Sequence, residues 1–120
     1  MSSILLALAV TAASPSMTAG EFLARAEPLL SKSQFSLVFS SEARSLMRLV
    51  GEAAQQTRDR LDTDRAAGRH VTTCLPPKGQ ATIESRELLA YLHGLSPAER
   101  GQSFQQAFSG YAARKYPCRR

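Results

Sequence analysis

Two cysteines, Cys74 and Cys118, are side chains in this sequence that could do chemistry, and the sequence has no third cysteine. One pair in a small exported domain is typical of a disulfide bond, whereas in a reducing compartment it would be two buried thiols. Neither cysteine lies in a C-x-x-C motif, so we expect a structural bond without a redox role. His70 precedes Cys74 by four residues and could join it as a metal ligand, but a bridged Cys74 could not bind metal, and we predict no metal site.

Acidic side chains gather at Asp59, Asp62 and Asp64, but this segment lacks the glycine and the final glutamate of a calcium-binding loop. Arginines are interleaved with these aspartates, which is typical of a solvated helix face. The sequence also lacks the G-x-S-x-G, H-E-x-x-H, G-x-x-x-x-G-K and G-x-G-x-x-G motifs. We therefore predict a protein that is not an enzyme and that holds no cofactor.

Positive charge collects at the C-terminal end, in a basic patch of Arg114, Lys115, Arg119 and Arg120 with no acidic residue after Glu99. The chain has 15 Lys and Arg against 10 Asp and Glu, a formal net charge of +5, so the patch holds most of the excess. It could bind nucleic acid, anionic lipid or an acidic protein surface, or be helix-end charge with a solvated tail. Export argues against nucleic acid, and membrane contact stays open.

The first 20 residues carry no charged side chain. The apolar run 4–10 is followed by small residues and Pro15, the pattern of a secretory signal with its cleavage site. The run is too short for a bilayer, which needs about 20 apolar residues. We predict a signal peptide at 1–17, one helical domain at 18–120 and a periplasmic location. The alternative is a buried first helix in a cytosolic domain.

The rest of the sequence predicts an all-α fold, a small four-helix domain with one disulfide. Apolar residues at three- and four-residue steps place the helices at about 18–30, 41–67, 83–93 and 97–116, with a loop at 68–80. The expected disulfide would tie this loop to the end of the last helix and close the two C-terminal helices into a hairpin.

Local signals indicate where these helices begin and end. Thr18-Ala-Gly-Glu21 is a capping box, and Ser96-Pro-Ala-Glu99 combines an N-cap serine with a proline at the first helical position. Pro28 should kink or shorten the first helix, and Gly68 is a natural C-cap. Gly51, inside the long helix, costs about 1 kcal/mol relative to Ala and is expected to admit a close helix neighbour.

Two further expectations concern the segments on either side of Ser40. Phe35, Leu37 and Phe39 alternate with other residues, so we expect residues 31–39 to form a packed connection and not a helix. The long helix that follows should bury one apolar face. That face comprises Ala43, Leu46, Met47, Val50, Ala53, Ala54, Thr57 and Leu61.

The C-terminal part of the sequence carries a distinctive succession of residues. In order, these are Cys74-Leu75-Pro76-Pro77, Glu87 to Leu92, Pro97, Ala107-Phe108 and Tyr116-Pro117-Cys118. The succession resembles the Tai/Rap family of periplasmic immunity proteins, which neutralise peptidoglycan amidases delivered by type VI secretion. This resemblance covers residues 74–118. It implies a small all-helical fold, a bridge between the two cysteines, often a homodimer, and inhibition by plugging an enzyme's cleft.

We therefore expect an exported, non-enzymatic binding protein, whose partner the resemblance identifies as a secreted cell-wall amidase. The stiff loop of Leu75, Pro76, Pro77, Lys78 and Gly79 would be the plug. One alternative is a periplasmic stress or structural protein similar to an acid-stress chaperone, which should expose apolar surface and dissociate at low pH. Ten acidic residues leave such a protein little charge to titrate. Another alternative is an envelope-associated protein that uses the basic patch.

Overall fold

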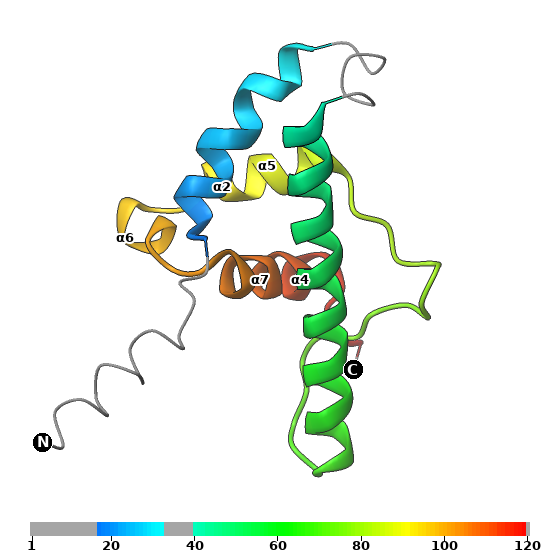
Figure 1. The fold of residues 1–120 in the computed structure, drawn as a ribbon. Helices are drawn as coiled ribbons and strands as arrows, with labels where there is room; N and C mark the ends of the chain where they lie inside the picture. Colours follow the sequence, from blue (N-terminus) through cyan, green and yellow to red (C-terminus); the bar gives the residue numbers. More distant parts are fainter. Residues whose placement is uncertain (1–16, 33–39, 120) are drawn as a thin grey trace, which may run out of the picture.

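The computed structural model describes residues 17–32 and 40–119, and these form an all-α fold (Figure 1). The predicted all-α class is therefore confirmed. Residues 1–16 of the predicted signal peptide, residues 33–39 of the alternating segment and Arg120 lie outside the described residues. The elements in chain order are α2 (Ala19–Ala26), the 3₁₀ helix η1 (Glu27–Ser31), α4 (Ser41–Ala66), α5 (Ser85–His93), α6 (Pro97–Arg100) and α7 (Phe104–Lys115).

Local interactions determine where the first helix begins and ends. The Thr18 hydroxyl accepts from the Glu21 amide at 3.1 Å, and the Glu21 carboxylate accepts from the Thr18 amide at 2.8 Å. These bonds satisfy amides that a helix start leaves without partners. Pro28 lies in η1, directly after α2, so the expected shortening is confirmed. The chain continues as a 3₁₀ helix because proline has no amide hydrogen to donate to an α-helical hydrogen bond.

The predicted continuous helix from Pro97 is wrong, because α6 ends at Arg100 and α7 begins at Phe104. Backbone pairing with the start of the described chain accounts for the break. The Gln102 carbonyl accepts from the Ala19 amide at 2.9 Å, and the Phe104 amide donates to Met17 at 2.8 Å. Ser103 then caps α7 with Gln106 in an S-x-x-Q capping box, which is a local signal in the sequence.

The core lies where α2, α5 and α7 meet, and part of α4 packs on it. Phe22 and Phe104 stack with ring centroids 4.1 Å apart, and Leu92 has no exposed surface. Figure 1 shows α5 and α7 running across the long α4, with α2 beside them. The predicted buried faces of α5 and α7 are confirmed in most positions, although Tyr91 is only half-buried.

The expected apolar face of α4 is only partly buried. Ala43, Leu46, Ala53 and Thr57 are buried, but Met47 is 72% exposed, so its predicted burial is wrong. The C-terminal turns of α4 extend beyond the other helices, and the chain returns alongside them (Figure 1). Gly68, at φ +77°, makes that return, as its position as a C-cap predicts.

Of the helices in the described part of the chain, not one combines the length and the apolar character needed to cross a bilayer.

Candidate functional site

A disulfide between Cys74 and Cys118 joins the segment after α4 to the segment after α7, as predicted. Backbone hydrogen bonds flank it on both sides. The Cys74 amide donates to Tyr116 at 2.8 Å, and the Cys118 amide donates to Thr72 at 2.9 Å. The disulfide and this short antiparallel pairing join the segment before α5 to the segment after α7. They also fix the start of the loop at residues 74–82.

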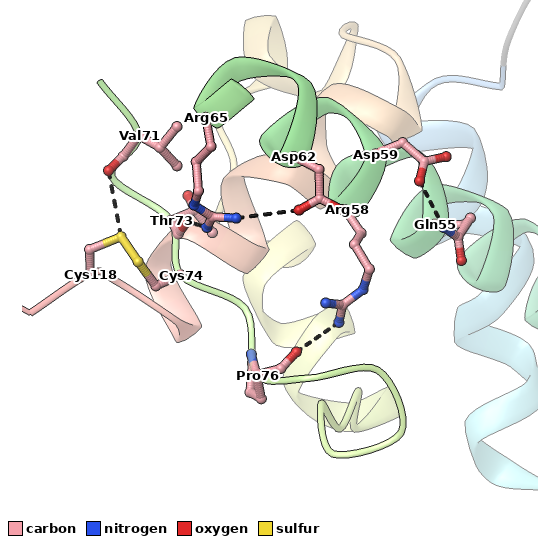
Figure 2. Close-up of polar contacts among 10 residues, drawn as sticks. All are labelled: Gln55, Arg58, Asp59, Asp62, Arg65, Val71, Thr73, Cys74, Pro76 and Cys118. Carbon is pink, nitrogen blue, oxygen red and sulfur yellow. Dashed lines mark hydrogen bonds and ion pairs between the residues drawn. A yellow bond between two sulfur atoms is a disulfide. The ribbon is translucent and has the colours of Figure 1, made fainter. Parts of the chain in front are cut away.

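Two arginines of α4 hold the same segment from the other side (Figure 2). Arg65 donates to the Thr73 carbonyl at 3.2 Å and pairs with Asp62 at 3.3 Å. About two turns earlier in α4, Arg58 donates to the Pro76 carbonyl at 2.9 Å. Charged donors on backbone carbonyls make stronger hydrogen bonds than neutral donors, so these contacts restrain the loop where it leaves the disulfide.

The far end of the loop is held at Thr82. Its carbonyl accepts from the Lys115 ammonium at 3.0 Å, and its amide donates to the Tyr116 hydroxyl at 3.1 Å. Both partners belong to the end of α7 or the residue after it. The loop 74–82 is therefore tied at both ends to the same corner of the molecule.

The five predicted binding residues divide into an anchored part and a free tip. Leu75 packs against the core, and Pro76 is half-buried. Pro77, Lys78 and Gly79 are exposed, and we call these three residues the loop tip. The tip turns sharply, since the Gln80 amide donates to Pro77 at 2.9 Å and Gly79 has φ +92°.

The loop arches over a cavity instead of lying flat on the helices. This cavity of about 200 Å³ lies between the loop, α4 and α7. In Figure 1 the segment between α4 and α5 projects from the helical body. Lys78 and Gly79 line this cavity, and the tip residues are also exposed to a partner.

The predicted basic patch does not act as one group of free charges. Lys115 pairs with Glu87 at 2.6 Å, and this hydrogen bond raises the pKa of Lys115 and lowers that of Glu87. Arg114 lies over the Tyr91 ring at 6.0 Å. Arg119 is exposed, and Arg120 lies outside the described residues. Of these four charges, that of Lys115 is therefore compensated, whereas Arg114 and Arg119 are exposed.

Tyr111 completes a small polar cluster with Glu87 and Lys115. Its hydroxyl donates to Glu87 at 2.7 Å. Burial, followed by that hydrogen bond, raises the pKa of Tyr111 to about 12. A neutral tyrosine and a compensated ion pair connect α5 to α7, which is a structural arrangement and not an activated nucleophile.

The acidic residues of α4 form local pairs on its solvated face, as expected from the sequence. Asp59 accepts from Gln55 at 2.9 Å, and Asp64 pairs with Arg69 at 2.8 Å. Among residues 17–32 and 40–119, no three His, Cys, Asp or Glu side chains come together as a set of metal ligands. His93 pairs with Glu27 at 2.8 Å across the gap between α5 and η1.

A second feature, an apolar groove of about 390 Å³, was not expected from the sequence. It lies between four elements, α2, η1, α4 and α5. Sequence reasoning missed it because Met47 was expected to be buried. The residues lining the groove are Phe22, Ala26, Leu29, Leu30, Lys32, Ala43, Leu46, Met47, Val50, Ile83, Ser85, Arg86, Leu88 and Leu89.

The likeness to the Tai/Rap immunity proteins rests on the succession of residues within 74–118 alone. Comparisons of the chain with protein families, with curated proteins and with solved structures gave no match.

Proposed function

We propose that this chain is an exported, non-enzymatic binding protein that inserts the loop tip into the cleft of a partner protein. The partner that its resemblance to the Tai/Rap family suggests is a secreted peptidoglycan amidase, which the chain would inhibit in the periplasm. The observation that carries the proposal is a loop tied at both ends, with Pro77, Lys78 and Gly79 exposed at its tip.

The physical support is preorganisation. A loop that is already held in one shape loses less conformational entropy on binding than a free loop. Two adjacent prolines and the disulfide restrict the tip before any partner arrives. The disulfide also suits the oxidising compartment that the predicted signal peptide would reach.

The test is inhibition of purified type VI cell-wall amidases by the purified chain, measured as the rate of peptidoglycan cleavage. We expect one member of such a panel to be inhibited at a ratio of about one chain per enzyme. Lys78→Glu should weaken that inhibition at least about tenfold, because it reverses the charge at the centre of the contact.

The matched control is Arg48→Glu, which makes the same kind of charge reversal, from a cation to Glu, at an exposed position of α4 that does not line the cavity under the loop. This variant should inhibit as well as the unchanged chain. Failure to inhibit any amidase would count against the proposed partner. Equal inhibition by the Lys78→Glu chain would count against the tip.

A second candidate function, a periplasmic stress protein similar to an acid-stress chaperone, is favoured by one observation. Leu30, Met47 and Ile83 are large apolar side chains that remain exposed. Such surface is what a client-binding protein needs. Light scattering of an aggregating client at low pH separates the two functions, since an amidase inhibitor should leave the aggregation unchanged.

A further inference from the structure

The apolar groove is a concave surface that the loop at 74–82 does not explain. It opens between α2, η1, α4 and α5, and the described residues leave part of its apolar lining exposed. Its volume of about 390 Å³ falls within the range of about 300–1,000 Å³ typical of small-molecule sites. The lining is apolar except at three positions, Lys32, Ser85 and Arg86.

The exposed apolar side chains all belong to this groove. Leu30 comes from η1, Met47 from α4 and Ile83 from the residues before α5, and they are the large hydrophobic side chains that are exposed in the described residues. Single exposed hydrophobic residues are ordinary on protein surfaces, but three that converge on one groove from separate elements mark a binding surface.

The charges at the groove have one sign. Lys32 follows η1, and Arg86 lies in the first turn of α5. No carboxylate is among the described residues that line the groove. Both cations are exposed, and they border an apolar surface that a hydrocarbon chain could cover. The lining therefore combines a place for a hydrocarbon chain with a place for a negative head group.

We infer that the groove binds a single-chain anionic amphiphile, a long-chain carboxylate of the fatty-acid type. Its hydrocarbon chain lies along the apolar wall, where Met47 and Leu89 contribute, and its carboxylate meets Lys32 and Arg86. The binding does not depend on the loop tip. An amidase inhibitor that fails to bind fatty acid, and a fatty-acid binder that inhibits no amidase, are therefore distinguishable.

The experiment titrates palmitate, below the concentration at which it aggregates, into the purified chain carrying ¹³C-methyl methionine. Met47 lies in the groove, and its methyl signal reports on binding there. We expect a saturable shift of this signal at one equivalent of palmitate. Hexadecanol, which has the same chain length without the charge, should bind about tenfold more weakly.

The deciding variant is Lys32→Glu combined with Arg86→Glu, which reverses both charges at exposed positions. Its control is Arg44→Glu combined with Arg48→Glu, an equal change of charge at exposed positions of α4 outside the groove. The first pair should weaken palmitate binding at least about tenfold, and the second should leave it unchanged. Thermal unfolding of both variants shows that each is folded before it is titrated.

Three results would overturn the inference. One is the absence of a saturable Met47 shift, which would mean that the groove is covered by another part of the chain or by a second copy. Sedimentation of the unchanged chain then tells these occupants apart. The others are equal binding of palmitate and hexadecanol, and equal palmitate binding by the two charge-reversed pairs, since either would show adsorption to an apolar surface without recognition of the carboxylate.

Discussion

The loop at 74–82 and the apolar groove are built in opposite ways. The loop buries little, and directional bonds hold it: a disulfide, two arginines and the contacts of Thr82. The groove is formed by apolar packing that the described residues leave without a cover on one side. Directional bonds fix the shape of an exposed segment, whereas packing without a cover leaves surface that can accept a ligand. The chain thus offers a shaped projection and an adaptable concave surface on one small body.

The largest expected effect comes from the loop. Replacing Cys74 and Cys118 together by serine should lower the free energy of unfolding by about 4 kcal/mol, because the bond closes a loop of 44 residues in the unfolded chain. Urea denaturation followed by circular dichroism measures this loss. A loss below about 1 kcal/mol would mean that the arginine contacts hold the loop without the covalent bond.

The loss of unfolding free energy on truncating a side chain should be several-fold larger in the core than at the groove. Leu92→Ala removes a side chain with no exposed surface and should cost about 3 kcal/mol. Met47→Ala, at a side chain that is 72% exposed, should change the unfolding free energy by less than about 0.5 kcal/mol. Urea midpoints of both variants test the contrast. Equal costs would show that Met47 is covered in solution.

Two helical glycines, Gly51 and Gly110, differ in how closely other side chains approach them. A Cβ at Gly51 would meet nothing within 4 Å, so Gly51→Ala should stabilise the chain by about 1 kcal/mol. A Cβ at Gly110 would meet the hydroxyl of Tyr91, so Gly110→Ala should give no such gain. Thermal denaturation compares the two. A gain at both positions would show that the Tyr91 ring moves aside at little cost.

The smallest effect concerns the capping boxes at the starts of α2 and α6. Hydrogen bonds from Thr18 to Glu21, and from Ser96 to Glu99, lower the pKa of each carboxyl below its ordinary value of 4.5. Their contribution to stability is therefore complete above pH 4.5 and is lost as the pH falls through the lower pKa of the folded state.

The corresponding variant is Glu21→Gln with Glu99→Gln, which keeps a capping side chain but cannot titrate. Its unfolding midpoint should fall less steeply with acid than that of the unchanged chain, as a series of urea titrations would show. Glu52→Gln, at an exposed position of α4, serves as control. If the urea midpoint depended on pH equally in all three chains, the capping boxes would not contribute to the loss of stability in acid.

Local chemistry made much of the fold predictable. The box at Thr18 and the stop at Pro28 depend on residues three or four apart, so the sequence contains both partners of each contact. The S-x-x-Q box at Ser103 was equally local, but a continuous helix was expected because the apolar spacing runs on through Phe104. Gly51 shows the limit of such reasoning. It was expected to admit a close neighbour, which is wrong, whereas Gly110 of α7 does have one, the Tyr91 side chain.

The sequence by itself determined the all-α class, most of the helix ends and the identity of the bridged cysteines, because short-range hydrogen bonds and a single available pair decide them. Only the tertiary structure decided which loop residues are free, since the donor to Pro76 is Arg58, 18 residues earlier in the chain. It also decided that Met47 lies in a groove and not in the core. An apolar pattern states that a face can be buried, but the position of the neighbouring helices determines how much of that face is covered.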